Sequence, residues 1–120
     1  MKIKFPNKKY NNFKEYYKGY FSELNSCLKE KNLNEVKKVT NFLHVKYKKN
    51  LNIFVCGNGG SAAIANHFEC DHKKILSETN KINPKIMSLC SNNSLITAIA
   101  NDFSYNHVFK KQLEYFANKN

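Results

Sequence analysis

A short apolar run that ends in a glycine-rich turn constrains the fold of this chain more than any other feature. Residues 51–56 read LNIFVC, and residues 57–61 read GNGGS. A segment of helical composition, AAIANHF, follows from Ala62. A buried strand that passes through glycines into a helix is typical of proteins that alternate strands and helices around a parallel sheet. We therefore predict an α/β architecture from residue 51 onward.

The spacing of apolar residues predicts the other elements. Apolar side chains recur at three- and four-residue steps in the first 50 residues, which is the pattern of amphipathic helices. We expect Asn32 or Asn34 to cap the second of these helices. A second apolar run after the glycine turn predicts another strand. The predicted helices are at Tyr10–Glu30, Asn34–Lys49, Asn93–Ala100 and Tyr105–Ala117, and the second strand is at Lys85–Cys90.

The length of 120 residues allows one domain. We divide it into a helical hairpin over residues 1–50 and the first α/β units over residues 51–120. Two strands are too few for a stable doubly wound sheet. We therefore expect the chain to be the N-terminal part of a larger domain: a fragment, a natural truncation, or a protein whose sheet a partner completes.

The net charge of +11 lies mostly in the helical hairpin. Residues 1–50 hold 13 Lys and 4 Glu, whereas residues 51–120 hold 7 Lys and 5 acidic residues. All 20 basic residues are lysine. The chain therefore lacks arginine, the residue that most often binds guanine and phosphate through two hydrogen bonds. We favour a solvated lysine-rich surface over a nucleic-acid interface. No apolar run has the length of a membrane helix, and the N-terminal residues lack the apolar core of a secretory signal.

The four cysteines are scattered and form no CxxC pair. They are Cys27, Cys56, Cys70 and Cys90, each in an apolar context. We predict buried free thiols in a reducing cytoplasm rather than a disulfide framework.

The glycine turn is the first candidate for chemistry. Glycines between a strand and a helix let backbone N–H groups approach an anion at the helix N-terminus. Ser61 is placed to cap that helix or to donate to a phosphate oxygen. The sequence matches neither the GxGxxG fingerprint of dinucleotide binding nor the Walker sequence. A simple tight turn is the alternative.

A histidine and two polar loop sequences follow the turn. His67 and Asp71 are four residues apart and share one helix face, where they suit a metal, an acid/base pair or a hydrogen-bonded surface pair. His72 points about 100° away from Asp71. The loop after the second strand carries Ser91, Asn92, Asn93 and Ser94. It meets the glycine turn at the carboxyl ends of the strands, where α/β sheets bind ligands, although Ser91 or Asn93 also suits a plain helix cap.

Three segments together resemble the phosphoheptose isomerases of the SIS (sugar isomerase) fold: CGNGGSAAIANHF, KIMSLCSNNS and LITAIANDFSYNHVFKKQLE. The resemblance implies a flavodoxin-like three-layer parallel sheet, incomplete in this chain, behind the N-terminal helical hairpin. It also implies conversion of sedoheptulose 7-phosphate to D-glycero-D-manno-heptose 7-phosphate for bacterial lipopolysaccharide or capsule. Such enzymes are cytoplasmic and typically homotetrameric, with active sites between subunits and often with zinc. We expect no nucleic-acid or membrane partner.

The resemblance also assigns roles to residues. It implies that Asp71 moves a proton between C1 and C2 of the sugar through an enediol, and that His67 and Asp71 bind zinc. Asp71 stands where the family usually has glutamate, and Asn92 stands where it commonly has aspartate. The implied substrate contacts are Asn58, Gly59, Gly60, Ser61, Ser91, Asn92, Asn93 and Ser94. The alternative is a non-catalytic SIS-type protein that binds sugar phosphates or serves as a protein-interaction scaffold.

Overall fold

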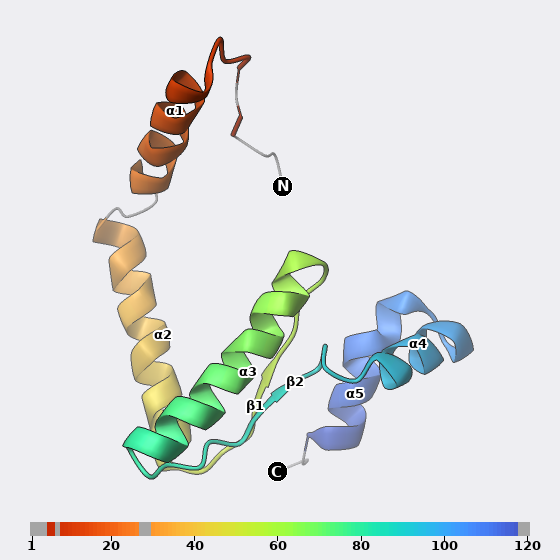
Figure 1. The fold of residues 1–120 in the computed structure, drawn as a ribbon. Coiled ribbons are helices and arrows are strands. Elements are labelled where there is room, and N and C mark those ends of the chain that lie inside the picture. The colour runs from red at the N-terminus through yellow and green to blue at the C-terminus, as the bar shows by residue number, and fades with distance from the viewer. Residues whose placement is uncertain (1–4, 7, 27–29, 118–120) are drawn as a thin grey trace. The chain divides into compact units, whose positions relative to one another are not determined.

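The computed structural model describes residues 5, 6, 8–26 and 30–117 (Figure 1). The chain forms two compact units, Met1–Leu43 and His44–Asn120. The first unit contains helix α1 (Phe13–Ser26) and most of helix α2 (Glu30–Lys48), whose last turn belongs to the second unit. Both predicted helices are therefore confirmed, with shifted ends. Asn32 and Asn34 lie inside α2, so the prediction that one of them caps it is wrong.

Helix α1 begins with a reciprocal cap. The Glu15 backbone N–H donates to Asn12 Oδ1 at 3.0 Å, and the Asn11 backbone N–H donates to Glu15 Oε2 at 3.3 Å. This arrangement satisfies N–H groups that have no partner within the helix. It explains why α1 begins at Phe13 rather than at the predicted Tyr10.

Part of the aromatic stripe of α1 packs against the segment that precedes the helix. The Phe5 ring lies 5.2 Å from the Tyr16 ring and 5.8 Å from the Tyr20 ring, between centroids. The aromatic side chains of α1 nevertheless remain exposed: Tyr16 is 40% and Phe13 is 78% exposed. The pairing of α1 with α2 as a hairpin stays a prediction.

The second unit is built on a two-stranded parallel sheet, as predicted. Strand β1 (Ile53–Val55) pairs with strand β2 (Ile86–Ser88), and Ile53 is in register with Ile86. Helix α3 (Gly60–Thr79) connects them. Both strands are shorter than the predicted runs.

Helix α3 packs on both strands through polar as well as apolar contacts. Ala65 is buried, the Ser88 hydroxyl donates to Asn66 Oδ1 at 2.6 Å, and the Ser88 backbone N–H donates to Glu69 Oε2 at 2.6 Å. The carboxylate therefore satisfies a strand N–H group that would otherwise be left without a partner.

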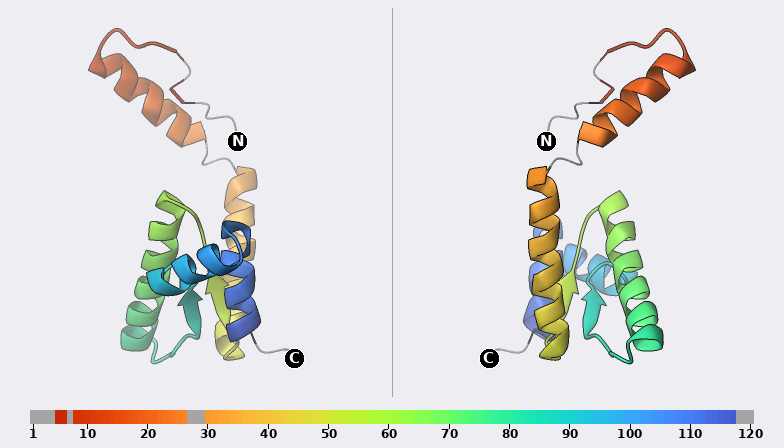
Figure 2. Two further views of the ribbon diagram at one scale, coloured as in Figure 1. Left: turned by 90° about the vertical axis from the view of Figure 1, so that its right-hand side faces the viewer. Right: turned by 90° about the vertical axis from the view of Figure 1, so that its left-hand side faces the viewer.

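The remaining elements are helix α4 (Asn93–Asp102), a 3₁₀ turn η1 (Tyr105–His107) and helix α5 (Val108–Phe116). Helices α3 and α5 lie on opposite sides of the strands in each view (Figure 2). The buried Gln112 side chain on α5 donates to the carbonyls of Leu89, at 2.9 Å, and Val108, at 3.0 Å. Leu89 directly follows β2, so this amide joins α5 to the strand.

The cysteines are free where the structure describes them, but most are not buried. Cys90 is buried, whereas Cys56 and Cys70 are exposed. The prediction of buried thiols is therefore wrong for Cys56, which directly follows β1, and for Cys70, which lies on α3. Cys27 lies outside the described residues. Within the described ranges, no helix is both long and apolar enough to cross a membrane.

Candidate functional site

The glycine turn makes a close passage from β1 into α3. Gly59 has φ 56° and ψ −125°, a backbone conformation that residues with a Cβ rarely adopt. A Cβ on Gly57 would lie 2.6 Å from the Ser61 backbone, so this position also requires glycine. Gly59 is the N-cap of α3 and no side chain caps the helix. The prediction that Ser61 caps α3 is therefore wrong, because the helix begins before it.

Hydrogen bonds between sulfur and backbone join the ends of the two strands. The Gly57 N–H donates to Cys90 Sγ at 3.3 Å, and the Cys90 thiol donates to the Gly57 carbonyl at 3.2 Å. Cys90 follows β2 and Gly57 follows β1, so the glycine turn lies beside the loop of residues 91–94. This is the juxtaposition that the parallel sheet predicts.

Two side chains of the loop of residues 91–94 form hydrogen bonds with nearby backbone groups. The Ser91 hydroxyl donates to the Ser88 carbonyl at 2.9 Å, and Asn92 Oδ1 accepts from the Leu95 N–H at 2.9 Å as the cap of α4. Asn92 is therefore the cap of α4, and the prediction that Ser91 or Asn93 caps this helix is wrong; Ser91 bonds to the last residue of β2 instead, and Asn93 is the first residue of α4. Asn93 differs from Ser91 and Asn92, since it lines a cavity.

A small cavity of about 140 Å³ lies between the two loops. The Tyr105 hydroxyl of η1 lies at this cavity and donates to Asn58 Oδ1 at 2.7 Å. The lining comes from the glycine turn, the start of α3, α4, η1 and α5. It consists of Gly57, Asn58, Gly59, Ala62, Cys90, Asn93, Ile96, Tyr105, Val108 and Phe109. Gly60, Ser61 and Ser94 are not part of it.

The histidine and aspartate predicted as a pair do meet. His67 Nε2 lies 3.5 Å from Asp71 Oδ2, and their side chains are 76% and 48% exposed. They lie on α3 outside the lining of the small cavity. His72 turns to the Phe68 carbonyl, with Nδ1 2.8 Å from that oxygen, as its predicted direction implies.

Two functional candidates were not predicted from the sequence. Tyr105 reaches Asn58 across 47 positions of the chain, and only the fold brings them together. Cys70 lies close to His67 and Asp71, and the donor atoms of the three are within 4.8 Å of one another. The spacing His-x-x-Cys-Asp on a helix is the signal that could have identified Cys70.

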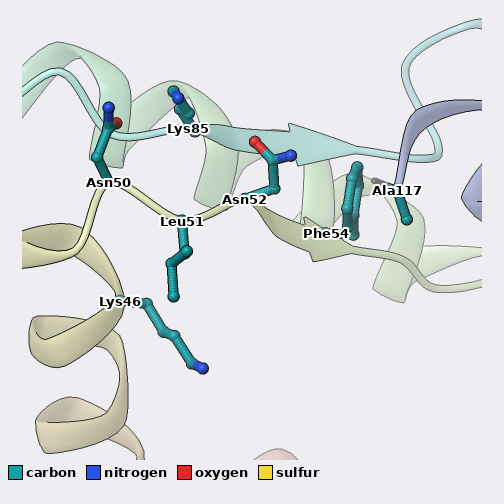
Figure 3. A pocket seen from close by; sticks show the side chains of 7 residues that line it. All are labelled: Lys46, Asn50, Leu51, Asn52, Phe54, Lys85 and Ala117. Atoms are coloured by element: carbon teal, nitrogen blue, oxygen red, sulfur yellow. The ribbon is translucent and has the colours of Figure 1, made fainter. Parts of the chain in front are cut away.

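A larger cavity of about 410 Å³ lies at the opposite ends of the strands (Figure 3). Its lining includes Asn52, just before β1, and Lys85, just before β2. The lysines Lys46 and Lys85 extend in different directions and do not converge on a common point. The amino ends of parallel strands are not where α/β proteins bind ligands, so the smaller cavity is the better candidate.

Comparisons with known proteins identify the family of the chain. The family model of the SIS domain matches residues 16–119. A probable phosphoheptose isomerase from Thermoplasma volcanium is 37% identical over 98 residues, which are 82% of this chain and 50% of that protein. A phosphoheptose isomerase from Clostridium acetobutylicum is 32% identical over 84 residues, which are 70% of this chain and 42% of that protein.

The fold also matches a solved structure. The phosphoheptose isomerase from Neisseria gonorrhoeae superposes with a TM-score of 0.64 and 26% identity, covering 89% of this chain and 56% of that chain. The chain thus spans about half the length of the relatives it matches. The family model covers both the helical segment from α1 and the α/β unit that carries the glycine turn. The chain therefore belongs to the SIS domain family.

Proposed function

We propose that this chain takes part in the isomerisation of sedoheptulose 7-phosphate to D-glycero-D-manno-heptose 7-phosphate, in the cytoplasm, for bacterial lipopolysaccharide or capsule. Relatives that carry the name phosphoheptose isomerase support this proposal. The chain spans about half of their length, so this reaction is a proposal for this chain.

The observation that carries the proposal is the paired loops around the small cavity. The N-terminus of α3 at Gly60 favours an anion through the helix dipole, and Gly59 leaves room for close approach because nothing lies within 4 Å of where a Cβ on it would be. Asn58 and Asn93 add amides that can bind sugar hydroxyls. A phosphorylated polyol needs this combination of anion site and neutral hydrogen-bonding groups. We propose Asn58, Gly59, Gly60, Ser61, Asn93 and Ser94 as its contacts.

Asp71 is the proposed acid/base residue. Its carboxylate takes a proton from C1 of the ketose while O2 gains a proton from solvent, which gives an enediol; the carboxyl group then returns its proton to C2 while O1 releases a proton to solvent, which gives the aldose. The carboxylate is half-exposed, and His67 Nε2 lies 3.5 Å from it. An acid/base group of this kind contributes about 10²–10⁴-fold to the rate.

Zinc is the proposed cofactor, with His67 and Asp71 as ligands. Imidazole nitrogen and carboxylate oxygen are ordinary zinc donors, so the pair fits the ion. When bound, zinc polarises the oxygens of the sugar and stabilises negative charge on them. This chain's own residues bind the ion and move the proton.

We also propose that the active protein is a homo-oligomer, a tetramer by resemblance, with sites between subunits. The cavity of about 140 Å³ is smaller than the roughly 300 Å³ at which ligand pockets usually begin. His67 is 76% exposed and lies outside that cavity. A second subunit placed against α3 would enclose both.

Turnover of sedoheptulose 7-phosphate tests the proposed function. We expect Asp71→Asn to lower the rate by at least about 100-fold, since the amide cannot accept the proton. Asp71→Glu should retain or increase the rate, because it keeps a carboxylate. Glu78→Gln, an exposed residue on the same helix, is the matched control and should not change the rate.

Equal turnover in the wild-type chain and Asp71→Asn would remove the assignment of catalysis to Asp71. Absence of turnover with clear thermal stabilisation by the sugar phosphate would favour the non-catalytic alternative instead.

A further inference from the structure

A third potential metal ligand stands beside the proposed pair on α3. Cys70 is exposed and free, and its sulfur belongs to a group with His67 and Asp71 in which all donor atoms lie within 4.8 Å of one another. Positions separated by three and four residues share one helix face, so the backbone of α3 itself sets this arrangement.

The distances are close to those of a metal site. Zinc bonds of about 2.0–2.3 Å in a tetrahedron hold neighbouring ligand atoms roughly 3.5 Å apart. His67 Nε2 and Asp71 Oδ2 already lie at 3.5 Å. The remaining separations are at most 4.8 Å, so they exceed that ideal by at most roughly 1.3 Å, and exposed side chains can shift this far without disturbing the core.

The kinds of donor atom also indicate which ion would bind. An imidazole, a thiolate and a carboxylate make three protein ligands and leave a fourth tetrahedral position open, as in catalytic zinc sites. Sulfur is a soft ligand that suits Zn²⁺ and Co²⁺, whereas Mg²⁺ prefers oxygen. The thiol releases its proton to solvent when the sulfur binds the ion.

We propose that Cys70 is a direct ligand in a His67–Cys70–Asp71 site, and that its sulfur makes the site select Zn²⁺ or Co²⁺ over Mg²⁺. The presence of a metal at this place rests on the proposed function. The participation of sulfur rests on the geometry of α3.

Cobalt titration of the full chain tests the proposal. Co²⁺ should produce a near-ultraviolet thiolate-to-cobalt charge-transfer band in the wild-type chain and in Cys56→Ser, and none in Cys70→Ser. Cys56 is the matched control because it is also exposed and free but lies outside the group. Cys70→Ser should lower zinc affinity by more than about tenfold, since even the loss of an outer-shell partner costs 10–100-fold. Excess Mg²⁺ should not displace the cobalt.

A measurement on the unmodified chain avoids dependence on the folding of variants. Zn²⁺ should protect Cys70, and not Cys56, from alkylation by iodoacetamide, and X-ray absorption at the zinc edge should show sulfur at about 2.3 Å. A cobalt band that survives in Cys70→Ser, unprotected Cys70, or a zinc shell without sulfur would overturn the proposal. Sulfur-bound zinc without isomerisation would contradict the proposed function alone. Metal-dependent isomerisation without bound sulfur would contradict the role of Cys70 alone.

Discussion

Asn58 is the residue at which the two sides of the small cavity meet. It lies in the glycine turn, and its side-chain oxygen accepts a hydrogen bond of 2.7 Å from the Tyr105 hydroxyl. This bond fixes which way the amide faces, and so which of its groups a sugar would meet. Tyr105 is therefore a positioning residue for the proposed sugar-phosphate site.

Replacing Tyr105 by phenylalanine tests this role. We expect Tyr105→Phe to weaken binding of sedoheptulose 7-phosphate by roughly two- to tenfold, the usual worth of one hydrogen bond. Isothermal titration of the sugar phosphate measures it, and Tyr115→Phe, another exposed tyrosine outside the lining, is the control. Unchanged affinity in Tyr105→Phe would show that the tyrosine does not position Asn58.

At the residue scale, sequence spacing predicts neighbours on one helix but not partners across the fold. The pairing of His67 with Asp71 follows from helical geometry and is confirmed. The contacts that reach Ser88 from Asn66 and Glu69 depend on how α3 sits on the strand, which spacing does not reveal. Asn92, expected to contact substrate, caps α4. An asparagine before a helix suits either role, so the sequence alone does not distinguish them.

At the scale of elements, the glycine turn is the most constrained segment of the second unit. Gly57 has no room for a Cβ, whereas nothing lies within 4 Å of the position that a Cβ on Gly60 would occupy. Gly60 is also the first residue of α3 and has no positive φ. The two glycines therefore differ in what they contribute to stability.

This difference is measurable by chemical denaturation. Gly57→Ala should lower the free energy of unfolding by about 1–3 kcal/mol, because the Ser61 backbone must shift to admit the methyl group. Gly60→Ala should be neutral or stabilising by up to about 1 kcal/mol, since alanine favours the helix. Equal destabilisation by both substitutions would contradict the structure of the turn.

The elements themselves were predictable because each has a clear period or composition. The strands are shorter than predicted, since the apolar runs continue past the paired residues into the turns. The helix ends were predicted less well. The α1 cap at Asn12 and Glu15 is a sequence signature, whereas α3 begins on a glycine without any side-chain cap.

At the scale of the molecule, the second unit exposes much apolar surface. Its two strands are both edge strands, and large apolar side chains are open to solvent: Ile64 is 70%, Phe103 55%, Tyr115 54% and Ile75 52% exposed. Unpaired strand edges and exposed apolar residues favour association.

We expect the purified chain to self-associate, in line with the proposed homo-oligomer. Sedimentation velocity over a range of concentrations should show species larger than the 14.0 kDa monomer. Because Ile64 lies on α3 and is the most exposed of these residues, Ile64→Glu should shift the equilibrium toward monomer. A chain that stays monomeric at all concentrations would contradict the proposed assembly.

The overall fold class was predictable because the order strand, glycine turn, helix and strand admits a parallel connection. The full set of residues in the site could not be predicted, because the sequence does not show which residues a second subunit would contribute. His67 and Asp71 illustrate this limit: spacing pairs them, while the fold leaves them outside the cavity that the loops enclose.

Proton exchange at C1 of the sugar is the sharpest test of the proposed isomerisation, because it detects the first step even where complete turnover is slow. Sedoheptulose 7-phosphate is incubated with the chain in heavy water, and deuterium at C1 is followed by nuclear magnetic resonance. The half-exposed Asp71 carboxyl exchanges its proton with solvent, so the wild-type chain should incorporate deuterium at least about 100-fold faster than Asp71→Asn. Equal incorporation by both chains, or none above buffer alone, would contradict the proposed role of Asp71 and of this chain in the reaction.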